Sequence, residues 1–304
     1  MKVLVTGGSG FIGSHIADSL SDKGHDVRIV DIRRSEYQKK NQEMMVVDIL
    51  DQDALDKSVE GCEAVYHLAG IADLDNASTR PAETVRQNVL GTILLLESCR
   101  KADIRRFIYA STIYVYSEKG GFYRCSKQAA ETYIHEYHRR YGLEYTILRF
   151  GTLYGPRADN RNSVWRYLYQ ALKDGKIMGS GTGEEIREYI HVRDAARLSS
   201  QVLDEEFANQ QVTITGHHPI KYRQLLETIK EMLGGRIDIS FNNEDSNDHY
   251  RMTPYSYTPK IGHKLVSNYY VDMGQGLLEC VQEMESSIFN DSQEKHIVID
   301  DENR

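Results

Sequence analysis

The sequence predicts an α/β fold, in which a doubly wound parallel sheet is followed by a smaller and more irregular C-terminal part. Two observations carry this prediction. Up to about residue 151, short runs of apolar and β-branched residues alternate with amphipathic stretches of helical period. Beyond it the regularity loosens, and glycine and proline gather in GTLYGPR and GSGTGEE. Nearly continuous apolar strands that alternate with helices are typical of a parallel sheet covered on both faces.

The alternation can be followed in order along the chain. The expected strands are KVLVTG, DVRIVD, MMVVDI, AVYHLAG, RRFIYAST and EYTILRF, and the helices between them include IGSHIADSLSDKG, AETVRQNVLGTILLLESCRKA and RCSKQAAETYIHEYHRR. REYIHV and QVTITG are two further strand-like runs, and we expect the helices after them to return to the sheet. The expected organisation is a first domain over 1–151 with returning segments at about 193–230, a second domain over 152–192 and 231–288, and a flexible tail over 289–304.

Composition and charge exclude several classes of function. The 304 residues are 40% hydrophobic and 27% charged, and their net charge of -8 disfavours nucleic acid or an anionic membrane as a general partner. The four cysteines show neither a C-x-x-C pair nor metal-ligand spacing, so we expect reduced thiols and no metal site. No apolar run approaches the roughly 20 residues of a membrane helix, and MKVLVTGGSG leaves no room for a signal peptide. A cytoplasmic protein is the expectation.

The stretch VLVTGGSGFIGSHIADSL predicts a strand, a glycine turn and a helix. Gly7, Gly10 and Gly13 fit G-x-x-G-x-x-G, and Gly8 gives an alternative G-x-G-x-x-G. The first glycine permits the tight turn, the second lets backbone approach a pyrophosphate, and the third lets the helix pack closely on the strand. The first domain is therefore predicted to be a dinucleotide-binding Rossmann domain.

An acid ends the next predicted strand, at Asp31 in VRIVD. A carboxylate at this place accepts both ribose hydroxyls of the adenosine and repels a 2′-phosphate. Arg33 and Arg34 lie just beyond it and could instead hold a 2′-phosphate. We favour NAD over NADP.

Tyr-x-x-x-Lys occurs twice, at Tyr123 and Lys127 and again at Tyr169 and Lys173. Only the first pair follows a predicted strand that ends in a Ser-Thr pair, with Thr112 last. This is the edge where an open α/β sheet presents its ligand. Tyr123 is therefore the catalytic candidate, and Tyr169 is assigned to an ordinary helix.

These motifs, in this order, resemble the extended short-chain dehydrogenase/reductases, and within them the NAD-dependent epimerase/dehydratase family that acts on nucleotide sugars. The likeness extends to about residue 234. VVDILD resembles the family's residue pair that contacts adenine, and YHLAG resembles the stretch beside the cofactor. The helix that leads into the family's catalytic strand is matched by NVLGTILLLESCRKADIRRFIYAST. The substrate side of the family is matched by LRFGTLYGPR and REYIHVRDAAR. The cofactor-binding residues that the resemblance and the turn imply together are Gly7, Gly10, Phe11, Ile12, Gly13, Asp31, Ile32, Arg33, Asp48, Ile49, Leu68, Ala69, Gly70, Asn88, Tyr123, Lys127 and Phe150.

The resemblance implies a nucleotide-diphosphate sugar as the substrate. Tyr123, as phenolate, would take the proton from a sugar hydroxyl while hydride leaves the same carbon for the nicotinamide. Lys127 would lower the phenol pKa and bond the nicotinamide ribose, and Thr112 would align the hydroxyl. His67 and His191 are expected to make hydrogen bonds without acid–base work.

The substrate-binding residues are less completely matched. Arg187 is the best diphosphate ligand, and Thr152 stands where an asparagine often meets the phosphates. Arg251 is the weakest of the three candidates, and Arg157 is left open between a structural and a ligating role. The resemblance also implies a homodimer that pairs helices near 84–101 and 123–141, with TILLLESC supplying apolar surface.

Two departures from the family pattern narrow the reaction. Dehydratases carry an Asp-Glu pair after the catalytic threonine and decarboxylases a glutamate at the second position, whereas Ile113 and Tyr114 stand here. Residues 113–122 also form a shorter loop than in relatives, which predicts a more open site or one covered by the C-terminal segment.

Three functions remain open at this stage. The first is an epimerase that inverts C4 through a transient 4-keto sugar and keeps its NAD. The second is an NAD-dependent dehydrogenase or ketoreductase with net cofactor turnover. The third is a non-catalytic dinucleotide-binding sensor, which the intact Tyr-x-x-x-Lys disfavours.

Overall fold

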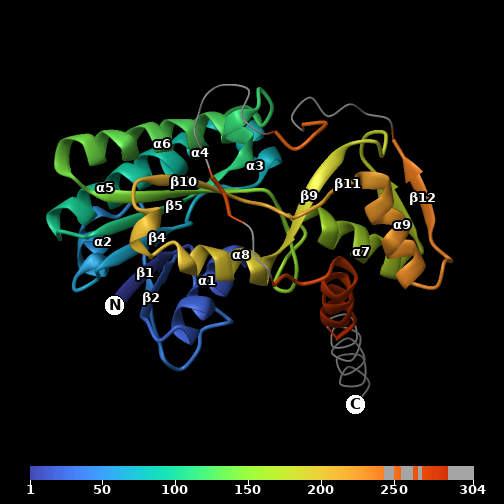
Figure 1. Ribbon diagram of the computed structural model, residues 1–304, viewed down its shortest axis with the longest axis horizontal. Coiled ribbons are helices and arrows are strands. Elements are labelled where there is room, and N and C mark those ends of the chain that lie inside the picture. Colours follow the sequence, from blue (N-terminus) through green and yellow to red (C-terminus); the bar gives the residue numbers. More distant parts are fainter. Residues whose placement is uncertain (243–249, 255–262, 266–268, 287–304) are drawn as a thin grey trace, which may run out of the picture.

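The computed structural model describes residues 1–242, 250–254, 263–265 and 269–286. Figure 1 shows a larger lobe built on one twisted sheet and a smaller lobe beside it. The expected tail at 289–304 lies outside the described residues. The elements are β1 (Lys2–Thr6), α1 (Phe11–Asp22), β2 (Asp26–Asp31), β3 (Gln42–Val46), α2 (Gln52–Val59), β4 (Ala64–His67), α3 (Leu74–Thr79), α4 (Pro81–Val85), η1 (Arg86–Leu90), α5 (Gly91–Lys101), β5 (Arg106–Thr112), η2 (Ile113–Tyr116), α6 (Gly121–Tyr141), β6 (Glu144–Phe150), β7 (Thr152–Tyr154), α7 (Ser163–Asp174), β8 (Lys176–Gly179), β9 (Ile186–His191), α8 (Val192–Gln201), η3 (Glu205–Phe207), β10 (Gln210–Ile214), β11 (Pro219–Lys221), α9 (Tyr222–Met232), β12 (Asp238–Phe241) and β13 (His263–Lys264).

The larger lobe confirms the predicted fold class. Its sheet has the strand order β13-β10-β6-β5-β4-β1-β2-β3, and every neighbouring pair is parallel. The order reverses between β1 and β4, which places the glycine turn after β1 at the switch point where such sheets bind ligands. β5 and β6 pair from Arg106 with Glu144 to Thr112 with Phe150, so both strands end at the same edge.

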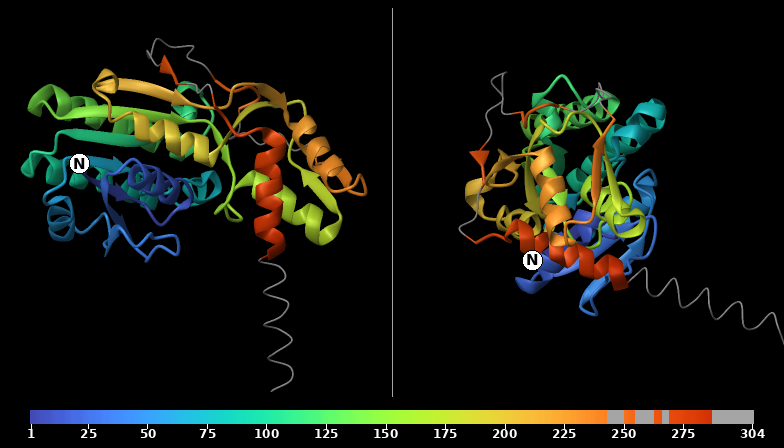
Figure 2. Two further views of the ribbon diagram at one scale, coloured as in Figure 1. Left: turned by 60° about the horizontal axis from the view of Figure 1, so that its bottom comes forward. Right: turned by 90° about the vertical axis from the view of Figure 1, so that its right-hand side faces the viewer.

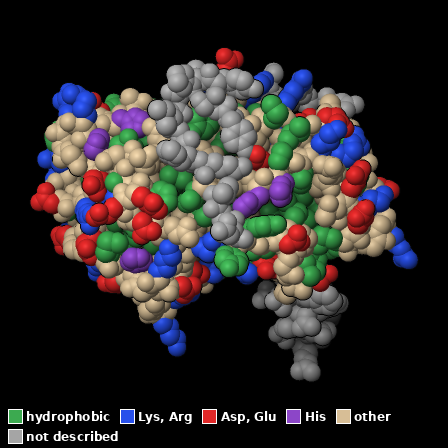
Figure 3. Space-filling view, viewed as in Figure 1, with side chains coloured by type: hydrophobic (Ala, Val, Ile, Leu, Met, Phe, Trp, Pro, Cys, Tyr) green, Lys and Arg blue, Asp and Glu red, His purple; other side chains and the backbone are tan. Residues whose placement is uncertain are grey.

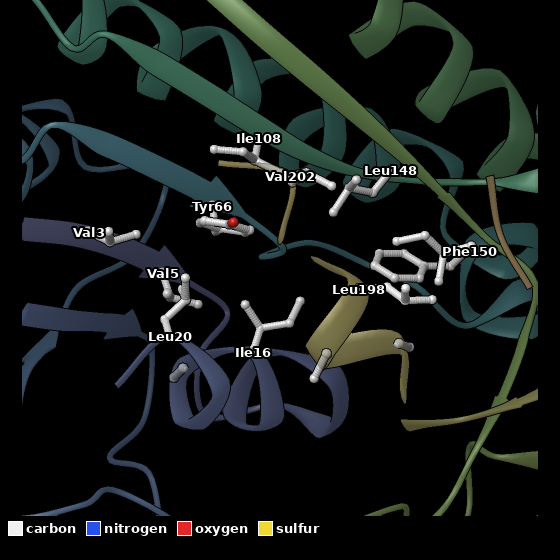
Figure 4. Close-up of a cluster of buried hydrophobic side chains, with 14 of the residues drawn as sticks. Val3, Val5, Ile16, Leu20, Tyr66, Ile108, Leu148, Phe150, Leu198 and Val202 are labelled. Carbon is white, nitrogen blue, oxygen red and sulfur yellow. The ribbon is translucent and has the colours of Figure 1, made fainter. Parts of the chain in front are cut away.

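Helices cover both faces of the sheet because its strands are apolar on both sides. On one face α1 packs against α8, and the buried side chains between them and the sheet form the cluster in Figure 4, to which Ile16, Ile108, Leu148 and Leu198 belong. On the other face α2, α5 and α6 cover a second cluster. Leu95 and Leu96 of TILLLESC are fully buried there, so they serve this chain's own core.

The smaller lobe has its own cluster of buried side chains, drawn from α7, β8, β9, α9, β12 and a helical run at 273–286. Its strands form a three-stranded sheet, β11-β9-β7, and the pair β12-β8. After β9 the chain returns to the large sheet through α8 and β10, whereas α9 packs on α7 and β11. In Figure 2 the run at 273–286, coloured red, lies where the two lobes meet.

The visible surface has no block of one charge. In Figure 3, lysine and arginine side chains are interspersed with aspartate and glutamate over the described part of this face. Among the described residues, no helix is both long enough and apolar enough to cross a membrane.

Candidate functional site

The glycine turn has no room for side chains. Gly7 has a φ of +71°, and a Cβ there would lie 2.6 Å from the backbone nitrogen of Ala69. A Cβ on Gly13 would lie 2.1 Å from the carbonyl oxygen of Gly7. The first-turn amides of α1 have no intrahelical acceptor, as in any helix. The N-cap residue Gly10 has no side chain that could accept from them. The turn is therefore a backbone cradle at a helix N-terminus, which suits a pyrophosphate.

Asp31, at the end of β2, lies beside this turn. Its Oδ2 accepts a hydrogen bond of 3.0 Å from the Ser9 backbone amide, and the Ser9 hydroxyl donates to the Arg33 carbonyl over 2.9 Å. Ile32 is 70% exposed, and the Arg33 side chain is exposed as well. The carboxylate is thus placed for a ribose next to the pyrophosphate cradle, which is the arrangement expected for an adenosine without a 2′-phosphate.

The other cofactor candidates lie on both faces of the sheet. Asp48 is exposed, whereas the Ile49 side chain is buried against Gly91, where a Cβ would lie 2.7 Å from its Cδ1. Phe150, at the end of β6, contributes its ring to the cluster on the α1 and α8 face (Figure 4). Ile12 and Leu68 also pack against that cluster.

Asn88, in η1, holds the loop that follows β4. Its Oδ1 accepts from the Ile71 amide over 2.7 Å, and its Nδ2 donates to the Ile71 carbonyl and to the Ser126 hydroxyl, each over 2.9 Å. Gly70 has a φ of +144°, and a Cβ there would lie only 2.5 Å from Asn88 Oδ1. The side chain of Asn88 therefore ties the chain at Ile71, just after Gly70, to Ser126 of α6.

The structure brings Thr112, Tyr123 and Lys127 together at the end of β5. Thr112 is the last residue of β5, and Tyr123 and Lys127 lie one turn apart on α6, all nearly buried. The Lys127 ammonium donates to the Ala110 carbonyl over 2.8 Å and lies 5.8 Å from the centre of the Tyr123 ring. A hydrogen bond joins Thr112 and Tyr123.

Burial sets the protonation of this group. It raises the pKa of the Tyr123 phenol from 10.0 to about 12, against the lowering effect of the bond with Thr112. It lowers the pKa of the Lys127 ammonium from 10.5 to about 8, against the raising effect of Glu131. The expectation that Lys127 lowers the phenol pKa below its usual value is therefore wrong for this structure, because desolvation dominates and the ammonium is directed to Ala110.

A buried ion pair lies behind β5. Arg149 of β6 donates to Glu131 of α6 through Nε at 3.0 Å and Nη2 at 2.7 Å, and their side chains are 0% and 3% exposed. Glu131 also accepts from the Ser111 hydroxyl over 2.6 Å, and Arg149 donates to the Tyr116 hydroxyl over 2.6 Å and to Gln211. This network connects β5, β6, η2 and α6 beneath the site.

The substrate candidates meet at a residue that the sequence reasoning missed, Tyr250. Its hydroxyl lies 3.3 Å from the Thr152 hydroxyl, and the Arg187 guanidinium stacks on its ring at 4.3 Å. Arg251 follows it, and the Arg251 carbonyl accepts from the Ile186 amide over 2.8 Å. Tyr250 stands in a stretch with no family motif, and only its place in HYRMTPYSY beside Arg251 could have suggested it.

The remaining candidates have structural partners. Tyr169 and Lys173 lie on α7 of the smaller lobe, where the ammonium donates to the phenol over 3.1 Å and Trp165 stacks on Tyr169. Arg157 pairs with Asp18 of α1 at 2.8 Å.

The histidines also hold structural hydrogen bonds. His67 lies between the hydroxyls of Thr6 and Thr92, at 2.8 and 3.0 Å, and burial lowers its pKa to about 3. Burial lowers the pKa of His191 as well, with Glu279 acting against it.

Comparison with known proteins places this site in a family. The model of the NAD dependent epimerase/dehydratase family matches residues 3–215. A Methanocaldococcus jannaschii protein named, provisionally, a UDP-glucose 4-epimerase is 32% identical over 272 residues, 82% of this chain and 88% of its own. UDP-glucuronic acid decarboxylase 1 of Xenopus tropicalis is 26% identical over 83% of this chain and 65% of its own.

Among solved structures, the UDP-glucose 4-epimerase of Thermotoga maritima with UDP-glucose superimposes with a TM-score of 0.82, at 27% identity, over 95% of this chain and all of its own. The UDP-N-acetylglucosamine 4-epimerase of Methanobrevibacter ruminantium, in complex with UDP-N-acetylmuramic acid, gives 0.80 at 25% identity, over 94% of this chain and 98% of its own. The glycine cradle and the carboxylate beside it fit NAD on their geometry. The chain thus belongs to the NAD dependent epimerase/dehydratase family, and its cofactor is NAD.

Proposed function

We propose that the protein is a nucleotide-sugar epimerase that inverts C4 of a UDP-hexose or UDP-hexuronate through a transient 4-keto sugar. The observation that carries the proposal is the buried Thr112, Tyr123 and Lys127 group at the end of β5, next to positions 113 and 114 that hold no carboxylate. This group has what removal of hydride from a carbinol and its return require. The loss of water and the loss of carbon dioxide, in contrast, need carboxylic acids at positions 113 and 114. This chain has Ile113 and Tyr114 there instead.

Each residue of the group has a distinct role in this proposal. NAD, when bound, supplies the hydride acceptor and later the donor. Tyr123 takes the proton from the O4 hydroxyl and later returns it, and Thr112 holds that hydroxyl in line. The Lys127 ammonium donates to the Ala110 carbonyl and so holds the end of β5 beside Tyr123.

The names of the relatives support a UDP-sugar but leave the reaction open, because decarboxylases stand beside epimerases among them. The competing function is a net NAD-dependent dehydrogenase or ketoreductase, which would use the same three residues. It differs in one measurable respect, since NADH would leave the protein in proportion to the substrate consumed.

The test incubates the NAD-loaded protein separately with UDP-glucose, UDP-N-acetylglucosamine and UDP-glucuronic acid. Proton NMR of the anomeric region should show the C4 epimer of one of them without a lasting rise in absorbance at the NADH band. NADH equal to the substrate consumed would refute the epimerase and support the dehydrogenase. Tyr123→Phe is the control for conversion by contaminating enzymes.

We also propose a homodimer formed through the helices of the α4–α6 side. Apolar side chains stay exposed there although Leu95 and Leu96 are buried: Val85 is 55% exposed, Phe122 52% and Tyr141 54%. Exposed apolar side chains on α4 and at both ends of α6 support a contact between copies along these helices. Light-scattering mass at micromolar concentration tests it, and a monomer would refute it.

A further inference from the structure

Tyr250 joins the two lobes at the candidate site. It is 5% exposed and belongs to a small cluster with Ile113, Val115 and Tyr116, the residues that follow the catalytic strand. Its ring also lies 4.9 Å from that of Tyr114, measured between ring centres. On the smaller lobe it reaches Thr152 of β7 and Arg187 of β9. One phenol therefore touches both the catalytic side and the substrate side.

The residues around Tyr250 fix its chain segment to β9. The Ile186 amide donates to the Arg251 carbonyl over 2.8 Å, and Ile186 and Met252 form a parallel bridge. The Glu188 amide donates to the Thr253 hydroxyl over 3.2 Å. Because backbone and side-chain bonds hold 251–253 along β9, the ring of Tyr250 stays in register with Arg187.

Arg187 has the charge and the geometry of an anion ligand. Its Nη1 donates to the Ile186 carbonyl, and within the described residues no ion pair to it is found. The neighbouring carboxylates have other partners: Glu185 accepts from the Thr182 and Gly183 amides, and Glu188 accepts from the Thr215 hydroxyl. A guanidinium that lies flat on an aromatic ring keeps its in-plane N–H donors at the edge of the ring, where they can bind phosphate oxygens in pairs.

We propose that Tyr250 is a positioning residue for substrate: its ring lies 4.3 Å from the Arg187 guanidinium and orients it to bind the diphosphate of the nucleotide sugar. The inference rests on the proposed function, since it takes a nucleotide diphosphate as the ligand. In this proposal the residues at 250–253 also cover the site, because the 113–122 loop is too short to cover it. Tyr250 contacts that loop's first residues directly.

Isothermal titration of the NAD-loaded protein with UDP measures the diphosphate site without the sugar. Tyr250→Leu removes the stacked ring and should weaken UDP binding about 3- to 30-fold, the range of a cation–π contact. Tyr250→Phe keeps the ring and loses the hydroxyl's bonds to Thr152 and Thr253, so its affinity for UDP should stay within about threefold of the wild type. For the candidate substrate, Tyr250→Leu should raise KM more than it lowers kcat.

A matched control is available in the same lobe. Arg223 stacks on Phe241 at 4.5 Å, away from the catalytic residues, so Phe241→Leu removes a similar contact and should leave UDP affinity unchanged. NAD content reports whether each variant keeps the larger lobe folded.

The outcomes separate the inference from the proposed function. Unchanged UDP affinity in Tyr250→Leu, equal losses in Tyr250→Leu and Tyr250→Phe, or an equal loss in Phe241→Leu would each overturn the role of Tyr250 while leaving the epimerase in place. A wild-type protein with no affinity for UDP would refute the UDP-sugar substrate and this inference together.

Discussion

Removing the charge of Glu131 should destabilise the protein strongly, because it strands the buried guanidinium of Arg149. Arg149 is 0% exposed, and two of its hydrogen bonds end on this one carboxylate. In Glu131→Gln, Arg149 keeps only neutral partners, namely the amide oxygen introduced at position 131, Tyr116 and Gln211. Loss of one partner from a buried ion pair costs about 3–5 kcal/mol, so we expect the free energy of unfolding to fall by that amount.

The double variant Glu131→Leu with Arg149→Met separates an uncompensated charge from lost packing. Replacing both members of a buried pair by apolar residues is often close to neutral, so the double variant should be more stable than Glu131→Gln. Arg139→Met serves as a surface control, since the pair of Arg139 with Glu136 is exposed and should contribute nothing measurable.

Urea unfolding followed by circular dichroism measures all four proteins. The reasoning would be refuted if Glu131→Gln lost less than about 1 kcal/mol, below the cost of a single unsatisfied buried group. It would also be refuted if the double variant were no more stable than Glu131→Gln. A second readout is the pKa of Lys127, which should fall below about 8 in Glu131→Gln because Glu131 raises it in the native protein.

Three other predictions follow from the site. Tyr123→Phe should reduce turnover by about 10²–10⁴-fold with NAD still bound, whereas Tyr169→Phe should change turnover little. Steady-state kinetics measures both variants, and equal turnover in the two would contradict the choice of Tyr123 as the base. Stripped protein should bind NAD more tightly than NADP in fluorescence titrations, and Asp31→Asn should narrow the difference; a preference for NADP would mean that Arg33 and Arg34 outweigh Asp31. Burial lowers the pKa of His67 from 6.5 to about 3, so the unfolded chain binds the proton first and stability should fall as pH falls from about 6.5 towards 3. Urea midpoints across that range should drop less in His67→Gln, and equal drops would show that His67 is not the group responsible.

The sequence by itself determined the Rossmann lobe and its cofactor, and it predicted which of the two Tyr-x-x-x-Lys pairs is catalytic. These features depend on local patterns: apolar strands alternating with helices, glycines where no Cβ fits between Gly7, Gly13 and Ala69, and an acid one strand later. Tyr123 and Lys127 are four residues apart on one helix, and Thr112 ends the strand before it, so their meeting follows from short-range geometry.

Only the tertiary structure decided what those residues experience and what stands opposite them. The pKa of Tyr123 is raised although a lysine lies one turn away, because burial depends on packing from distant segments. Tyr250 meets Thr152, Arg187 and Ile113 through contacts between residues far apart in the chain, in a stretch without periodicity or motif. Leu95 and Leu96 read as surface for a partner, yet they are buried beneath α2 and α6. Periodicity tells which face of a helix is apolar, but what covers that face depends on where the fold places the other helices.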